Sequence, residues 1–325
     1  MSAPMLSRIA ESLFWIGRYV ERADGTSRIL DASLSGMLED PWTDEDSACR
    51  ALLSVMGLAP RDGEDDVVGV VNSADVLEVL CYDDNNPSAV VGALGAAREN
   101  ARGAREVVSS ELWESLNGTW NSLTAQRQIA DLIGPAGFFS YVRDRTAALT
   151  GIIESTTSRD DGYRFIVLGR SLERVDMVSR LLSARVRSSR GVPTDAADWA
   201  VVLRACGADD TFVRTHRGAT DASLVVQFLL LDRLFPRSVF HALATAETCL
   251  SELDPDGSRA GVADPAQRAV GRARTDLEYL DVDMLLTQLP MHLDRIQAAC
   301  LGIGAAVAAR YFQYADAFTW AHEEA

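Results

Sequence analysis

Two short segments of the chain contain charged residues whose types and spacing could bind an anion or move a proton. Glu21 and Arg22 lie in the first segment, and Glu173 and Arg174 lie at the same relative positions in the second. A guanidinium binds carboxylate or phosphate through paired N–H donors, and a glutamate can act as a general base. Glu21 and Glu173 are therefore candidate catalytic residues. The candidate ligand-binding residues are Arg18, Glu21, Arg22, Arg98, Arg102, Arg105, Arg170, Glu173, Arg174, Arg237 and Ser238.

The two segments belong to a longer internal repeat. Residues 17–30 match residues 169–182 at Gly, Arg, Glu, Arg, Asp, Ser, Arg and Leu positions. A weaker match follows in the same order, between residues 83–97 and 232–246. The repeat predicts an internal duplication with halves of about 1–150 and 151–325, which pack around an approximate twofold axis as one helical bundle.

The charges of the first segment lie among apolar positions. In a helical projection, Arg18, Glu21 and Arg22 share a face with Phe14 and Ile29, and the other faces are largely apolar. Such a helix is buried, and its ions must pair, because removing one partner of a buried pair costs about 3–5 kcal/mol. We expect these residues and their counterparts in the second segment to be buried in salt bridges.

A further segment provides arginines from another expected helix. Arg98, Arg102 and Arg105 project onto one face together with Val91 and Leu94. We expect these three arginines to face the carboxylates of the repeat. The resulting network would be a structural clamp between the halves, or it would line a cleft that binds an anionic or peptide-like ligand. The carboxylates concerned are Glu21, Asp24, Glu173 and Asp176.

The motif Phe235-Pro236-Arg237-Ser238 resembles a helix start. Arg237 and Ser238 could meet an anion there, because the N-terminal end of a helix carries partial positive charge. Residues of these types at a helix start more often act as caps. Both roles stay open at this point.

The elements that must position these residues are expected to be helices. Apolar residues recur three and four apart over most of the chain, which predicts an all-α fold. Helices are expected at residues 7–33, 87–116, 160–185, 236–253, 265–280 and 284–314. Turn residues predict connections at 40–41, 61–63, 134–135, 188–193 and 254–257. Residues 67–71 are a short apolar run that is compatible with a strand.

Composition restricts the classes of function. The chain has 325 residues, with 47 Asp and Glu against 31 basic residues, all of them Arg, and a formal net charge of −16. This charge argues against nucleic-acid or anionic-membrane partners. The absence of lysine excludes Schiff-base and P-loop lysine chemistry.

Cysteine and histidine give no sign of a disulfide framework or a metal centre. The five cysteines are scattered, and no histidine has a carboxylate at metal-binding spacing, so no metal or cofactor is expected. Glu21 with Glu173 is the one pair that could hold a divalent ion through oxygens alone. No signal-peptide core or apolar run of about 20 residues is present, so we expect a soluble, cytoplasmic protein.

The assembled motifs resemble the bacterial alpha-E domain family. Residues 6–23 are similar to the opening of that family, and the later family motifs resemble residues 97–105 with Trp113 and Asn117, residues 168–176, and Asp232 with residues 236–238. The chain departs from the family pattern at Asp24-Gly25, where Glu-Asn is usual. The resemblance covers nearly the whole chain. It implies one all-helical alpha-E domain, residues 1–325, of uncharacterised function.

The same resemblance implies partners. Family members are typically encoded beside circularly permuted ATP-grasp proteins, thought to be amide ligases, and beside transglutaminase-like peptidases. We therefore expect an accessory protein that binds a ligand or a partner in an ATP-grasp-linked system of peptide synthesis or modification. The alternatives are an enzyme that forms or cleaves amide bonds with Glu21 or Glu173 as general base, and a purely structural scaffold.

Overall fold

The computed structural model describes residues 7–39, 44–58, 70–188, 196–217, 221–254 and 261–312. Every regular element in these ranges is helical, which confirms the predicted all-α class. The elements are α1 (Ser7–Glu39), α2 (Glu45–Val55), α3 (Ser73–Leu77), the π-helical segment η1 (Glu78–Tyr82), α4 (Val90–Gly103), α5 (Ser110–Ile133), α6 (Ala136–Thr156), α7 (Asp161–Ser188), α8 (Ala196–Ala205), α9 (Asp209–His216), α10 (Ala222–Leu231), α11 (Val239–Leu253), α12 (Pro265–Glu278), α13 (Val282–Leu285) and α14 (Leu289–Tyr311).

Local chemistry fixes several helix boundaries. Ser109 begins α5 by accepting a hydrogen bond from the N–H of Leu112, and Asp264 caps α12 ahead of Pro265. Gly134, at φ 95°, ends α5, because a left-handed φ favours glycine. The connection predicted at residues 134–135 is therefore confirmed.

Two predicted helices are each divided in the structure. The helix expected over residues 87–116 is two helices, because residues 104–109 form a turn between α4 and α5. Pro87 lies in the loop before α4 and is not a first-turn residue. The helix expected over 284–314 is divided into α13 and α14. Of the possible strand at 67–71, residues 67–69 lie outside the described ranges, and Val70 and Val71 are not in a strand.

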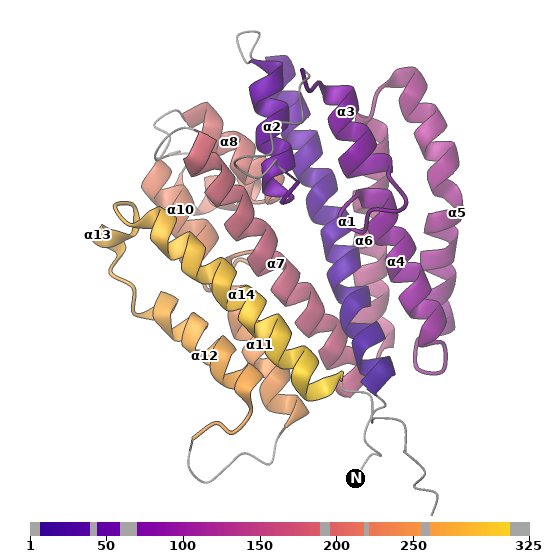
Figure 1. Cartoon of the computed structure of the whole chain (residues 1–325), viewed down its shortest axis with the longest axis vertical. Helices are drawn as coiled ribbons and strands as arrows, with labels where there is room; N and C mark the ends of the chain where they lie inside the picture. The colour runs from indigo at the N-terminus through magenta and orange to yellow at the C-terminus, as the bar shows by residue number, and fades with distance from the viewer. Residues whose placement is uncertain are drawn as a thin grey trace, which may run out of the picture.

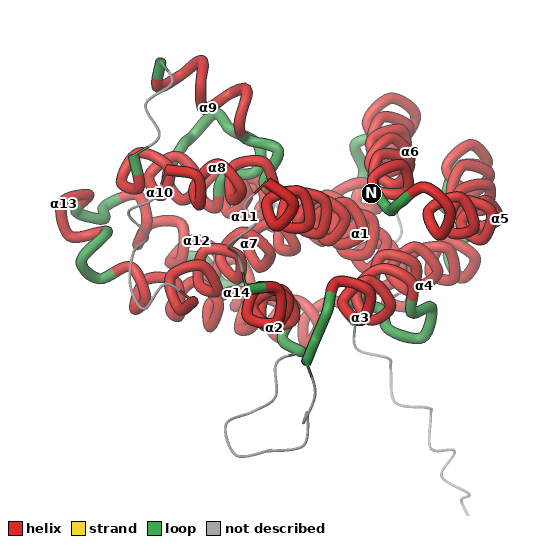
Figure 2. The backbone as a smooth tube through the Cα atoms, turned by 90° about the horizontal axis from the view of Figure 1, so that it is seen from above, coloured by secondary structure: helices red, strands yellow, loops and turns green. Residues whose placement is uncertain are grey.

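The helices form two groups on either side of the central pair α1 and α7. Helices α4 and α6 pack against α1, with α5 packed on their outer side, and α11 and α14 pack against α7, with α12 packed on their outer side (Figure 1). The contacts within the groups correspond: α1 contacts α4 and α6 as α7 contacts α11 and α14. The view along the helices shows both groups flanking the central pair (Figure 2).

Two shorter helices cross from one half to the other. Helix α2 packs against α7, and α8 packs against α1. Each half thus covers part of the central helix of the other half. These corresponding contacts support the inference of an internal duplication.

Glycines allow α1 and α7 to approach closely. A Cβ atom on Gly17 would lie 2.0 Å from the carbonyl oxygen of Ile166, and a Cβ on Gly169 would lie 2.0 Å from the carbonyl oxygen of Phe14. Neither position can hold a larger residue without a shift of backbone. The two backbones therefore pack directly on each other at corresponding positions of the repeat.

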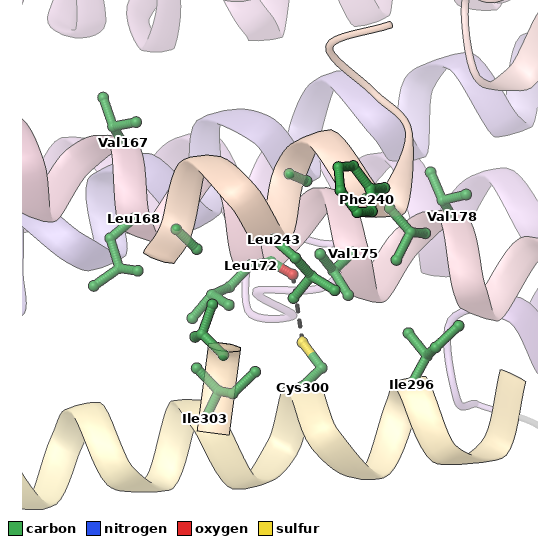
Figure 3. Packing of buried hydrophobic residues seen from close by; sticks show 14 of the residues in the cluster. Val167, Leu168, Leu172, Val175, Val178, Phe240, Leu243, Ile296, Cys300 and Ile303 are labelled. Carbon is green, nitrogen blue, oxygen red and sulfur yellow. Dashed lines mark hydrogen bonds between the residues drawn. The ribbon is translucent and has the colours of Figure 1, made fainter. Parts of the chain in front are cut away.

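Apolar side chains hold each group to the central pair. Around α7, Leu172 and Val175 pack with Leu243 of α11 and Ile303 of α14, and the thiol of Cys300 donates to the Leu172 carbonyl at 3.5 Å (Figure 3). A second core cluster joins the C-terminal half of α1 to α2, α4 and α6.

Candidate functional site

Two ion pairs cross the contact between α1 and α7. Arg22 on α1 pairs with Glu173 on α7, and Arg174 on α7 pairs with Glu21 on α1. Arg22 Nε donates to Glu173 Oε1 at 2.6 Å, and its Nη2 donates to Glu173 Oε2 at 3.0 Å. Arg174 Nη2 lies 3.0 Å from Glu21 Oε2. The carboxylates are almost fully buried, with exposed fractions of 5% for Glu21 and 1% for Glu173. The prediction of buried, salt-bridged charges on both segments is confirmed for these four residues.

Each of the two arginines also holds a loop. Arg22 Nη1 donates to the carbonyl of Pro87 at 3.3 Å, and Arg174 Nη1 donates to the carbonyl of Pro236 at 3.2 Å. The loops, residues 83–89 and 232–238, follow the same path and lead into α4 and α11. The arginines therefore join the central pair to the start of the next long helix in each half.

On each central helix, a further arginine pairs with an aspartate one turn before it. Arg28 Nε donates to Asp24 Oδ2 at 2.9 Å, and Arg180 Nε donates to Asp176 Oδ1 at 2.8 Å. Asp24 also accepts a hydrogen bond from the hydroxyl of Thr146 on α6 at 3.1 Å. Arg28 and Arg180 were not among the expected site residues, although the Asp-to-Arg spacing of four is present in both copies of the repeat.

The two sides of the cluster differ in which arginine gives each glutamate its second ion pair. In the second half, Arg237 Nη1 lies 2.8 Å from Glu21 Oε1, and its Nη2 pairs with Asp24. The corresponding loop position in the first half is Ser88. The other partner of Glu173 is instead Arg18, whose Nε donates to Oε2 at 2.5 Å.

Arg170, the counterpart of Arg18, turns away from the centre. Its Nη2 donates to Glu154 Oε1 on α6 at 2.8 Å. Arg237 fills the place beside Glu21 that Arg170 would otherwise take. Glu154 was not a candidate in the sequence analysis, because it lies outside the repeated motif and its contact depends on how α6 packs.

The arginines lower the pKa of two carboxylates of the cluster, Glu173 and Asp24. Burial alone would raise the pKa of Glu173, but the charges of Arg18 and Arg22 and their hydrogen bonds outweigh it, so this pKa lies below its usual value. The pKa of Asp24 is also lowered, because Arg237 and Arg28 outweigh the effect of burial. A general base needs a pKa near the working pH, so the alternative role of Glu173 as a base does not fit its surroundings.

Glu21 borders a small cavity. Its Oε1, although close to Arg237, has no hydrogen bond of good geometry, and the cavity beside it has a volume of about 20 Å³. Gly25, Met177 and Cys206 line the same cavity. Burial raises the pKa of the Cys206 thiol to about 12, so this cysteine lines the cavity as an uncharged thiol. The space suits about one water molecule and is too small for a substrate.

Three candidate residues lie apart from the cluster, contrary to prediction. Arg98 pairs with Glu99 and donates from Nε to Asn117 Oδ1, Arg102 pairs with Glu99 from an exposed position, and Arg105 lies exposed with its guanidinium 5.1 Å from the Trp113 ring centre. The prediction that they face the carboxylates of the repeat is wrong. There are two physical reasons. Helix α4 ends at Gly103, so Arg105 is not on the same helical face as Arg98 and Arg102. Within α4, alanines occupy much of the buried face.

Ser238 is a helix cap. Its hydroxyl oxygen accepts from the N–H of His241 at 3.0 Å, and its O–H donates to the carbonyl of Asp232. Ser238 is fully buried, and Arg237 points into the ionic cluster. Of the two roles considered for this motif, the local geometry therefore favours the structural one.

Within the described residues, no three His, Cys, Asp or Glu side chains gather as a metal site would require. Glu21 and Glu173, considered as a pair of oxygen ligands, are each turned toward arginines. The arrangement therefore favours binding of an anion over binding of a cation.

The Glu-Arg pairs agree with a known family pattern. The family model for Alpha-E, a predicted alpha-helical domain with a conserved ER motif, matches residues 5–312. The chain belongs to the Alpha-E family. In this Alpha-E domain, the sequence Glu-Arg occurs at residues 21–22 and 173–174, where α1 and α7 exchange their ion pairs.

Relatives of this Alpha-E chain are longer proteins. Uncharacterized proteins of Mycobacterium bovis and of Mycobacterium tuberculosis strain CDC 1551 are each 24% identical to it over 316 residues. The match covers 90% of this chain, which spans only 35% of the length of those relatives. No solved structure matches the chain. Among the described helices, none combines the length and apolar character that crossing a bilayer requires.

Proposed function

We propose that this Alpha-E chain is a binding module that holds the carboxylate of a peptide-like ligand at the arginines of α1 and α7. The observation that carries the proposal is an excess of guanidinium groups. Among the described residues, the ion pairs of the cluster join six arginines to four carboxylates. The arginines are Arg18, Arg22, Arg28, Arg174, Arg180 and Arg237, and the carboxylates are Glu21, Asp24, Glu173 and Asp176.

Arg18 is the best placed of these arginines. It uses Nε for Glu173, and within the described part of the chain its Nη1 and Nη2 have no protein acceptor. Its side chain is 13% exposed, and its guanidinium lies 5.7 Å from the ring centre of Trp15. Two parallel N–H donors held in this way match the geometry of a carboxylate.

We further propose that the module acts as an accessory to an ATP-grasp protein in peptide synthesis or modification, with a transglutaminase-like protein as a further possible partner. The resemblance of the motifs to the alpha-E domain proteins suggests these partners. The relatives support an accessory role, since nearly two thirds of their length lies outside the region that matches this chain. In this proposal the enzymatic step belongs to the partner.

Ligand-dependent melting tests the binding proposal. We expect a triglutamate peptide to raise the melting temperature of the wild type in proportion to its selective binding to the folded state. The amidated triglutamine peptide has no carboxylate and should have no effect. The Arg18→Lys variant keeps the charge but loses the guanidinium fork, so the peptide should no longer stabilise it relative to its own ligand-free melting temperature.

The matched control is Arg102→Lys, because Arg102 is exposed and its one ion pair within the described ranges is with Glu99. This variant should respond to triglutamate as the wild type does. No stabilisation of the wild type, or equal stabilisation of the Arg18→Lys variant, would show that the cluster is a clamp without a ligand. The partner proposal needs a separate test, co-purification from native cells with mass spectrometry, and it fails if no ATP-grasp protein accompanies the chain.

A further inference from the structure

A groove opens on the first half, away from the ionic cluster. It has a volume of about 350 Å³ and lies between the loop before α4, the outer face of α4, and α5. Asp84 and Pro87 line it from the loop, Gly95 and Glu99 from α4, and Trp120 from α5. This volume is within the range of pockets that hold small ligands or single side chains.

Glycine gives the groove its aromatic wall. A Cβ atom on Gly95 would lie 2.6 Å from the ring of Trp120, so the indole can pack against α4 only because this residue is glycine. The ring is partly buried and faces both the groove and the core. An aromatic face in such a position attracts cations.

The corresponding region of the second half holds arginines of the chain itself. Arg233, at the loop position that corresponds to Asp84, pairs with Glu278 of α12 at 3.0 Å. Arg274, also on α12, donates from Nε to Glu247 of α11 at 2.5 Å. The guanidinium carbons of Arg233 and Arg274 lie 5.1 and 6.0 Å from the ring centre of Phe240.

In the first half, the Trp120 ring and Asp84 both line the groove, and Arg98 is the one arginine in its lining. Asp84 is exposed and has no ion pair in the described structure; its carboxylate accepts one hydrogen bond, from the side-chain amide of Asn85 at 2.8 Å. Arg98 lines the groove, but its guanidinium already forms an ion pair with Glu99 and donates a hydrogen bond to Asn117. The first half therefore lacks the cation that the second half supplies from its own chain.

We propose that this groove binds an arginine side chain of a partner protein, with the guanidinium against the Trp120 ring and paired with Asp84. Arginine fits better than lysine, because its planar group can stack on an indole while its N–H donors reach a carboxylate. The net charge of −16 favours the approach of a basic partner segment. The site is distinct from the proposed carboxylate site at Arg18 and does not depend on it.

An NMR titration of the whole chain tests this proposal at Trp120. The probe is the blocked tripeptide acetyl-Gly-Arg-Gly-amide, observed through the indole N–H signal of Trp120, which is assigned by its loss in the Trp120→Phe variant. We expect this signal to shift with saturating dependence on the peptide. The same peptide with citrulline, which is close in shape but uncharged, should leave the signal unchanged.

Two substitutions distinguish a specific groove from general attraction to an acidic protein. Asp84→Asn keeps the hydrogen bond to Asn85 possible and should weaken binding about fivefold, the effect of losing one exposed ion pair. Asp276→Asn removes an equally exposed carboxylate on α12 and should leave the affinity unchanged. Equal affinity for the citrulline peptide, equal effects of both substitutions, or shifts confined to other indoles would overturn the proposal.

Discussion

At the scale of single residues, the central feature is Glu173, a buried glutamate that pairs with two arginines. Glu173 accepts hydrogen bonds from Arg18 and Arg22, and its carboxylate is almost completely shielded from water. A buried ion pair contributes little to stability compared with an apolar pair, but breaking it is costly because the remaining charges stay buried. Both glutamates of the repeat are held in this way, which ties the Glu-Arg motif to the packing of α1 against α7.

Removal of the Glu173 carboxylate should therefore strongly destabilise the fold. We expect Glu173→Ala to lower the free energy of unfolding by about 3–5 kcal/mol, because two guanidinium groups lose their buried partner. Urea unfolding followed by circular dichroism measures this change. The control is Glu99→Ala, which breaks exposed pairs and should cost about 1 kcal/mol or less. Equal effects of the two substitutions would contradict the burial of Glu173.

The lowered pKa values of Glu173 and Asp24 predict how stability depends on acid. A carboxyl group whose pKa is lower in the folded state stabilises the fold above its unfolded pKa, near 4, and loses this contribution as the pH falls toward the folded pKa. The free energy of unfolding should thus decrease below about pH 4. Glu173→Gln should make this decrease shallower when urea unfolding is measured from pH 6 to pH 2.5, and an unchanged acid profile would exclude Glu173 as a contributor.

At the scale of elements, the geometry of the site depends on how closely α1 and α7 approach. Gly17 and Gly169 bring the two backbones into contact, and this closeness allows Arg22 and Arg174 to reach the opposite helix. Loops 83–89 and 232–238 are then held by the same two arginines. Helix spacing and ion pairing therefore form one unit.

A methyl group at the helix contact should separate the pair. We expect Gly17→Ala to lower the free energy of unfolding by about 3 kcal/mol, the upper end for overpacking, because the new Cβ would meet a backbone oxygen that cannot rotate away. Thermal unfolding measures the loss. Gly151→Ala on α6 is the control: nothing lies within 4 Å of its new Cβ, so the higher helix propensity of alanine should stabilise the chain by up to about 1 kcal/mol. A neutral Gly17→Ala would mean that the helices lie farther apart.

At the scale of the whole molecule, the two halves depend on each other. Helices α1 and α7 bury charged and apolar faces against each other, and α2 and α8 each pack on the central helix of the other half. A half on its own would expose this surface and leave Glu21 or Glu173 without partners. We therefore expect the chain to unfold as one cooperative unit.

Separation of the halves tests this interdependence. If the chain is divided in the loop between Ser158 and Arg159, co-expressed fragments should associate into a helical complex. Either fragment alone should be unfolded, aggregated or paired with a second copy, because its central helix cannot stay exposed. Size-exclusion chromatography with circular dichroism distinguishes these outcomes. A stable, cooperatively folding monomer of one fragment would contradict the prediction.

The sequence by itself determined the all-α class, the repeated Glu-Arg motif and the burial of its charges. These features follow from helical periodicity, which is local: side chains three and four residues apart share a face wherever the helix goes. The same local rule predicts that Leu13, Ile16 and Val20 face the interior, as they do. It failed between Gly103 and Ser110, because a turn there resets the phase of the helix and leaves Arg105 outside the cluster.

Only the tertiary structure decided which arginine meets which carboxylate. Arg237 is 213 residues from Asp24, and Glu154 is 16 residues from Arg170, and neither contact has a sequence spacing that predicts it. The groove beside Trp120 likewise depends on how α5 packs across Gly95, and its counterpart is filled by Arg233 and Arg274. Pairing and cavities depend on the distances between separate helices. Those distances are set by packing over the whole chain, whereas periodicity reports only on one helix at a time.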